Sequence, residues 1–320
     1  MNAVDGWREK VLRLQSTVKK VIVGNDEIID GVIVSLLGGS HVLLEGVPGL
    51  GKTLLVRTLS DALGLSHARI QFTPDLMPAD ILGTTVVEQN ESGAQHFEFR
   101  QGPIFSSIVL ADEVNRATPK TQSALLEAMQ ERQVTIGGQT HALGRPYMVL
   151  ATQNPLEMEG TYPLPEAQLD RFFFKLKVPY PSADDLAQIL TRTTSGELEK
   201  VEPVLTRDEV VELQELVREV PAPTELIEYA VRLVRSTHPE LPESGAMVRQ
   251  YVATGASPRG AQALILAAKI GALLDGRILA GEADVRAALL PALRHRLILN
   301  FEGEAEAIDR DDILQELIRE

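Results

Sequence analysis

The stretch Gly46-Val47-Pro48-Gly49-Leu50-Gly51-Lys52-Thr53 follows directly on the apolar run His41-Val42-Leu43-Leu44-Glu45. Glycines spaced in this way and ending in Lys-Thr are typical of a loop whose backbone N–H groups curl around phosphates. The apolar run predicts a short buried strand before the loop, and residues 52 to about 63 predict a helix after it. The positive end of that helix dipole would face a bound anion. The stretch therefore predicts an α/β fold with a phosphate-binding loop.

The predicted cradle for ATP consists of Gly46, Val47, Pro48, Gly49, Leu50, Gly51, Lys52, Thr53 and Leu54. Lys52 is expected to reach the β- and γ-phosphates, and the hydroxyl of Thr53 is expected to bind Mg²⁺. The alternative is a glycine-rich turn that binds nothing. The strand before the loop and the helix after it supply the context that the motif requires.

An acidic pair ends a second apolar run, Ser107 to Ala111. A carboxylate at the tip of a buried strand beside the loop can hold Mg²⁺ through water, so we assign Asp112 to the metal. A second carboxylate can polarise the water that attacks the γ-phosphate, so we assign Glu113 as general base. The pair favours hydrolysis over phosphate transfer to a small molecule. The alternative is an acidic pair that opens a solvated loop.

Three further polar residues are candidates for the same chemistry. Asn154 ends the third apolar run, where its amide can bond the γ-phosphate or the attacking water, although Asn-Pro also starts turns. Arg171 begins a Phe-rich run and can stabilise transition-state charge in trans, or it is a solvated arginine at a strand end. Arg259 lies in the first turn of a long apolar helix, where a cation opposes the dipole unless an anion binds.

Composition excludes several classes of protein. The 320 residues contain no cysteine, so disulfides, zinc ribbons and thiol nucleophiles are ruled out. The six histidines are scattered and show no metal-binding spacing. The net charge of -14 argues against a nucleic-acid-coating protein. No run approaches the ~20 apolar residues of a membrane span, and the N-terminus lacks a signal-peptide core, so we expect a cytoplasmic protein.

The chain pattern changes near Pro179-Tyr180-Pro181. Before it, apolar strands alternate with helices, which predicts a mostly parallel sheet. Two hairpins are expected within this part, at about 73–103 with a turn at Glu91-Ser92-Gly93, and at about 133–146 with a turn at Gly137-Gly138. After it, strand patterns vanish and helix caps appear, for example the capping box of Thr206 with Glu209 and Ser257 before Pro258. We therefore predict a nucleotide-binding αβα domain over residues 1–180 and an all-α lid domain over residues 181–320.

The motifs GVPGLGKT, LADEVNRA, ATQNP, LPEAQLDRF and GASPRG, in this order, resemble the MoxR family of AAA+ ATPases. The resemblance runs from Val21 to Arg259. DEVNRA and EAQLDRF are specific to this group and its relatives. The two hairpins look like the helix-2 insert and the pre-sensor-1 hairpin of this clade.

The resemblance implies roles and partners that the residues alone do not. It implies Asn154 as sensor 1, Arg171 as the arginine finger and Arg259 as sensor 2, the last acting either within its own subunit or on the neighbour's nucleotide. Ile22, Val23 and Gly24 match the stretch that packs on adenine. The family also implies a hexameric ring and a chaperone-like role toward a protein client, often one with a von Willebrand factor A domain.

Three rival functions stay open at the level of sequence. A DNA motor of the MCM type needs basic hairpin tips, whereas the first hairpin carries Glu88 and Glu91. A metal-chelatase motor subunit is mechanistically similar and differs in its partner. An ATP-gated scaffold would bind nucleotide without turnover, which Glu113 and Arg171 argue against. The sequence names neither the client nor whether it is threaded or reshaped.

Overall fold

The computed structural model describes residues 3–47, 49–89, 95–155, 160–194 and 200–318. Five parallel strands of these residues form one sheet, in the order β2-β5-β8-β1-β9. Their bounds are β1 Val42–Glu45, β2 His67–Gln71, β5 Ile108–Asp112, β8 Met148–Gln153 and β9 Phe174–Lys177. The sheet is parallel as the sequence predicts, and because all strands run the same way, the loops after β1, β5 and β8 emerge at one edge.

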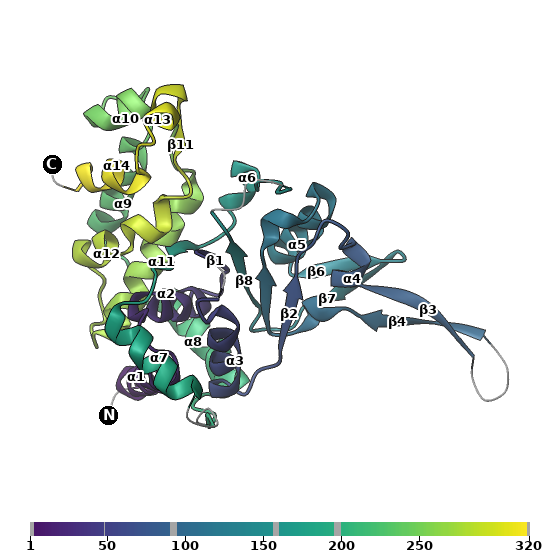
Figure 1. The fold of residues 1–320 in the computed structure, drawn as a ribbon. Coiled ribbons are helices and arrows are strands. Elements are labelled where there is room, and N and C mark those ends of the chain that lie inside the picture. Colours follow the sequence, from purple (N-terminus) through teal and green to yellow (C-terminus); the bar gives the residue numbers. More distant parts are fainter. Residues whose placement is uncertain (1–2, 48, 90–94, 156–159, 195–199, 319–320) are drawn as a thin grey trace.

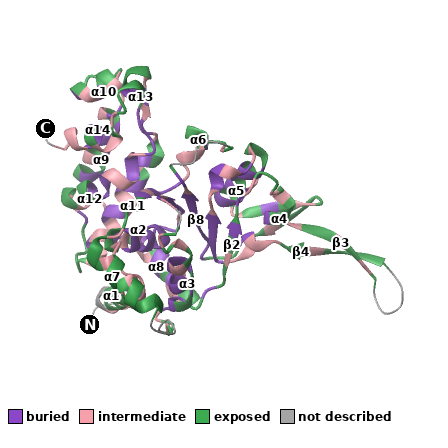
Figure 2. Ribbon diagram, viewed as in Figure 1, coloured by how far each residue is buried: buried purple, intermediate pink, exposed green. Residues whose placement is uncertain are grey.

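Side chains of the central strands alternate between the two faces of the sheet, which produces a layered core. One face gives Val42, Leu44, Ile108, Leu110, Met148 and Leu150 to a buried cluster that contains α1 (Ala3–Val21), α2 (Asp26–Leu37) and α3 (Lys52–Ala62). The opposite face gives Leu43, Val109, Ala111, Val149 and Ala151 to a second cluster with α4 (Pro78–Leu82) and α5 (Pro119–Glu131). The sheet is therefore sandwiched between helices, as Figures 1 and 2 show.

The sequence analysis did not predict strand β2. Only Ile70 of its five residues is buried, and the others are polar or small and partly exposed. An edge strand with so little apolar surface carries no clear pattern, and its identity depends on pairing with β5. This omission matters because β2 contributes side chains to the site described below.

Two hairpins leave the sheet layer. Strands β3 (Gly83–Gln89) and β4 (Gln95–Gln101) pair antiparallel, with Val87 opposite Phe97, and project far from the body (Figure 1). The expected turn at 91–93 lies outside the described residues. Strands β6 (Gln133–Ile136) and β7 (Gln139–Ala142) pair around Gly137-Gly138, both of which have positive φ.

The chain after Pro181 is mainly helical. Its helices are α7 (Ala183–Thr194), α8 (Arg207–Glu219), α9 (Thr224–Ser236), α10 (Ala246–Tyr251), α11 (Pro258–Leu274), α12 (Glu282–Leu293), α13 (Phe301–Ala305) and α14 (Arg310–Glu316). The expected caps are formed: Thr206 and Glu209 make a reciprocal capping box, and the Ser257 hydroxyl accepts from the N–H of Arg259. A short helix α6 (Glu166–Leu169) precedes β9.

The expectation of an all-α C-terminal region was wrong in one detail. Strands β10 (Val252–Thr254) and β11 (Ile298–Leu299) form an antiparallel pair there. The two strands are short and far apart in the chain, so no alternation of apolar and polar residues predicts them. Helices α8, α9, α11, α12 and α14 join the same buried cluster as α1, α2 and α3, and the division at residue 180 stays a prediction. Among the described residues, no helix has the length and apolarity to cross a membrane.

Candidate functional site

The loop between β1 and α3 has the backbone that a phosphate cradle requires. Gly49 and Gly51 have φ values of 87° and 75°, a region that side-chain-bearing residues rarely adopt. Gly51 stands at the N-cap of α3 and offers no capping side chain. The first backbone N–H groups of α3 are therefore available to a ligand. Pro48, which the sequence analysis assigned to the cradle, lies outside the described residues.

A polar cavity of about 240 Å³ opens beside this loop. It is lined by Gly49, Gly51, Lys52, Thr53, Arg69, Asp112, Glu113 and Asn154. These residues come from the loop, β2, and the carboxyl ends of β5 and β8, which the parallel sheet brings to one edge. The structure thus gathers five chemically active residues predicted from far-apart motifs, and it adds Arg69.

A second cavity, of about 410 Å³, adjoins the first and shares Gly49 and Gly51 with it. Its lining includes Ile22, Val23, Leu50 and Leu54 together with Leu186 and Ile189 of α7. A mostly apolar cavity next to a polar one fits a base beside a triphosphate. Gly24 is not part of the lining; a Cβ there would meet the carboxylate of Asp185 at 2.9 Å. Gly46 and Val47 line neither of these two cavities.

Lys52 points its ammonium along the loop and donates to the carbonyl oxygen of Gly46 at 2.8 Å. Half-burial lowers the pKa of Lys52, while the nearby charges of Asp112 and Glu113 oppose that shift. A lysine held in this way, at the start of a helix and inside the polar cavity, is suited to meet phosphate oxygens.

Asp112 and Glu113 are held by a shared network. The hydroxyl of Thr152 donates to Asp112 Oδ1 at 2.7 Å and accepts from the N–H of Glu113 at 2.8 Å. Glu113 has a φ of 57°, which is strained for a residue other than glycine. This backbone conformation directs the Glu113 carboxylate into the cavity beside Asp112. The hard oxygens of Asp112 and Thr53 line the same cavity, and this donor chemistry fits Mg²⁺.

Strand β2 supplies two residues that the sequence analysis missed. Arg69 donates to Asp112 Oδ2 from Nη2 at 2.7 Å and from Nε at 3.2 Å. Gln71 donates to Glu113 Oε2 at 2.8 Å, and Arg116 bonds the same oxygen at 3.0 Å. Both carboxylates therefore have cationic or amide partners. The only signal in the sequence was the i, i+2 spacing of two polar residues, which means little without knowing that β2 lies beside β5.

The two predicted arginines lie elsewhere. Arg171 donates from Nη1 to the carbonyl oxygen of Leu126 in α5 at 2.8 Å, and its Nε is buried without a hydrogen-bond partner in the described chain. Arg259 is about half exposed, and its Nη1 lies 3.4 Å from Asp170 Oδ2. Neither lines the polar cavity. Arg259 pairs with Asp170, the residue that precedes Arg171 in the chain, so the two arginines belong to the same region of the structure.

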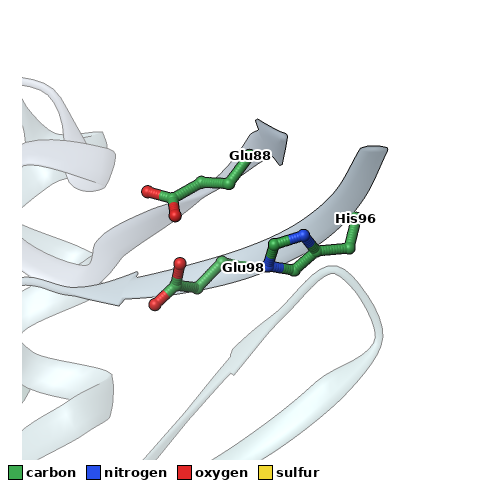
Figure 3. Close-up of side chains that lie close together, drawn as sticks. All are labelled: Glu88, His96 and Glu98. Atoms are coloured by element: carbon green, nitrogen blue, oxygen red, sulfur yellow. The ribbon is translucent and has the colours of Figure 1, made fainter. Parts of the chain in front are cut away.

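The outer part of the β3–β4 hairpin carries a separate charged cluster. The ligand atoms of Glu88, His96 and Glu98 all lie within 4.8 Å of one another (Figure 3). Arg100 forms an ion pair with Glu88, and its hydrogen bond is the main cause of the lowered pKa of that carboxyl. Arg100 thus already supplies a positive charge to Glu88, and we assign no metal to the cluster.

Comparisons with known proteins agree with this geometry. Residues 41–174 match the family described as ATPase family associated with various cellular activities (AAA), and residues 245–317 match the AAA lid domain. The chain is 43% identical over 304 residues to Chaperone MoxR1 of Mycobacterium tuberculosis, covering 94% of this chain and 79% of that protein. It is 30% identical over 334 residues to Protein MoxR of Methylorubrum extorquens, with 98% and 94% covered. A crystal structure from Cytophaga hutchinsonii superposes with a TM-score of 0.90 at 39% identity, covering 99% and 95% of the two chains.

Proposed function

Since the chain belongs to the MoxR family of AAA+ ATPases, we propose that it hydrolyses ATP with Mg²⁺ and uses the energy in a chaperone-like way to remodel a partner protein. The observation that carries the proposal is the polar cavity in which Lys52, Thr53, Asp112, Glu113 and Asn154 meet. No single motif would suffice, since glycine-rich turns and acidic pairs are common separately.

The roles follow from the positions of the side chains. Lys52 and the free N–H groups of α3 bind the phosphates, and the apolar second cavity takes the base. Bound Mg²⁺, held by Thr53 and Asp112, would neutralise charge on the phosphate oxygens. Glu113 accepts the proton of the water whose oxygen attacks the γ-phosphorus, as the bond to ADP breaks. Asn154 orients that water or the γ-phosphate from the end of β8.

Two side chains hold the Glu113 carboxylate through one of its oxygens. Gln71 and Arg116 both donate to Oε2, which fixes the direction of the carboxylate. We assign the other oxygen, Oε1, to the attacking water.

We assign Arg171 and Arg259 to the neighbouring subunit's nucleotide. Both lie away from the cavity of their own chain and close to each other through Asp170. A site shared in this way needs a head-to-tail interface, which closes into a ring, and we propose a hexamer. The trans position of Arg259 is part of this proposal.

The hairpins are the proposed contact surface for the client. On the β3–β4 hairpin the opposed residues Val87 and Phe97 are 55% and 79% exposed. The other face carries Glu88, His96 and Glu98 (Figure 3) beside Arg100, and this mixed charge is not the basic surface that phosphate backbones require, which favours a protein client over nucleic acid. That the client has a von Willebrand factor A domain stays a prediction, and so does the cytoplasmic location. The rival function is that of a motor subunit with a metal-chelatase partner.

Phosphate release and nucleotide binding test the proposal directly. Lys52→Ala should lose ATP binding, and Glu113→Gln should bind ATP and hydrolyse it at least about 100-fold more slowly. Arg57→Ala, an exposed position on the same helix as Lys52, is the matched control. Normal ATP affinity in Lys52→Ala, or undiminished turnover in Glu113→Gln, would overturn the assignment.

A further inference from the structure

A buried arginine connects the C-terminal helices to the segment that carries Arg171. The side chain of Arg296, in the turn after α12, is only 2% exposed. Its Nε donates to Asp170 Oδ1 at 2.9 Å, and its Nη2 donates to the carbonyl oxygens of Asp170 and Phe172 at 3.1 and 2.8 Å. Its Nη1 lies 3.3 Å from the carbonyl oxygen of Phe173. One guanidinium therefore holds the backbone on both sides of Arg171.

The two residues before Arg296 extend this attachment. His295 is buried and its Nε2 lies 3.0 Å from the carbonyl oxygen of Phe172. Arg294 donates to the carbonyl oxygen of Lys175 in β9 at 3.2 Å and to Asp311 in α14 at 2.9 Å. Three consecutive side chains thus fix residues 170–175 to the C-terminal helices.

Asp170 is the shared partner of this attachment. Its carboxylate accepts from Arg296, from the Ser257 hydroxyl at 2.7 Å, and lies 3.4 Å from Arg259. Ser257 caps α11, the helix whose first turn carries Arg259. The start of α11, the end of α12 and the segment before β9 therefore meet at one carboxylate. None of Asp170, Ser257 or Arg296 lines the two cavities of the nucleotide site.

We propose that Arg296, acting through Asp170, is a positioning residue that sets Arg171 and Arg259 as one rigid unit against the neighbouring subunit's nucleotide. The backbone beside Arg171 and the first turn of α11 are both fixed through Asp170, so a shift of α11 and α12 moves the backbone of both arginines together. The bond from Arg171 Nη1 to Leu126 in α5 opens when the side chain reaches the neighbouring subunit. The position of one protomer's C-terminal helices thereby controls hydrolysis in the next protomer. This inference rests on the proposed function, because it presumes that Arg171 acts in trans.

If the ion pair between Arg296 and Asp170 only stabilised the fold, the activity of the variants would differ from that expected for a positioning residue. Loss of such a pair would lower the activity of the protomer's own site along with its stability. Loss of a positioning residue leaves the protomer's own Lys52, Asp112 and Glu113 intact. It displaces only the two arginines that act on the neighbouring protomer's nucleotide. Mixing two inactive variants separates these cases, because each interface takes its site from one protomer and its arginines from the other.

The experiment pairs Arg296→Lys with Glu113→Gln. Arg296→Lys keeps the positive charge but loses the planar fork that reaches several acceptors at once. Alone, it should keep ATP affinity and lower kcat about 100-fold, the scale expected for a small misplacement of a catalytic group. In an equal mixture with Glu113→Gln, random assembly gives about a quarter of interfaces one intact site and one intact pair of arginines, so about a quarter of wild-type activity should return.

Controls make each outcome decisive. Arg310→Lys alters an arginine of the same region that contacts Glu304 and the carbonyl oxygen of Leu297 rather than residues 170–175, and it should behave as wild type. Should Arg296→Lys fail to fold, the double variant Asp170→Asn with Arg296→Met removes both buried charges together, a change that cores tolerate better, and it should complement Glu113→Gln in the same way.

The mixture of Arg171→Ala with Glu113→Gln separates the two proposals. If that mixture stays inactive, the trans assignment of Arg171 fails, and the inference fails with it. Suppose that this mixture regains activity, but that a folded Arg296 variant with normal ATP affinity regains none when it is mixed with Glu113→Gln. The positioning role of Arg296 is then wrong, and the proposed function stands.

Discussion

Replacing Arg69 with glutamine should strengthen the binding of Mg²⁺ at the nucleotide site. Arg69 Nη2 lies 2.7 Å from Asp112 Oδ2, so the guanidinium and the metal compete for the same carboxylate. The Arg69 side chain is 50% exposed and that of Asp112 14%, so solvent screens the pair, which contributes about 0.5–1 kcal/mol. Removing the competitor should therefore raise the apparent Mg²⁺ affinity about two- to fivefold.

The assay is a Mg²⁺ titration of a fluorescent ATP analogue in the Glu113→Gln background, which removes turnover. Binding of the analogue in excess chelator is measured separately, because Arg69 also lines the cavity and its charge can attract phosphates. Arg57→Gln is the matched control, since Arg57 is exposed on α3 and pairs only loosely with Asp61, at 3.8 Å. Unchanged or weaker Mg²⁺ affinity, with unchanged analogue binding in chelator, would refute the competition between Arg69 and the metal.

Three further predictions concern stability and surface. Burial lowers the pKa of His41 to about 4, so the unfolded chain binds an extra proton below about pH 6.5, and this residue lowers the free energy of unfolding by about 3 kcal/mol between pH 6.5 and 4. Burial also lowers the pKa of His295, which adds to the loss. Urea unfolding across this range should show the loss, His41→Gln should reduce it without abolishing it, and exposed His67→Gln should leave it unchanged. Asp170→Asn should cost about 3 kcal/mol in urea unfolding by leaving Arg296 buried without its counter-charge; a cost below about 1 kcal/mol would contradict the burial argument. Phe97→Ser should change the free energy of unfolding by less than about 0.5 kcal/mol and keep basal ATPase activity, while reducing the partners retained with ATP by the Glu113→Gln protein; equal retention would remove the hairpin as the contact surface.

Much of the site was readable from the sequence because its chemistry is local. The glycines of the loop are needed wherever the backbone must take positive φ, and Gly49 and Gly51 do so. The apolar runs before Asp112 and Asn154 identify buried parallel strands, and parallel strands release their ends at one edge. Loop, acidic pair and amide could therefore be expected together before any coordinate was known.

Side chains whose role depends on a neighbour in space could not be read in this way. Arg69 and Gln71 contact the acidic pair only because β2 lies beside β5, with Gln71 in register with Asp112. Arg296 follows Asp170 by 126 residues in the chain, yet the two form a buried ion pair. The short ladder of β10 and β11 likewise depends on a distant partner.

The sequence by itself determined the loop, the parallel sheet and the five predicted residues that meet in the polar cavity, since backbone conformation and hydrophobic period are properties of adjacent residues. Only the tertiary structure decided that Arg171 and Arg259 lie away from their own cavity and that Asp170 pairs with Arg259 and Arg296. The physical reason is that a charge acquires its partner from the packing of distant segments, and no periodicity along the chain encodes that distance.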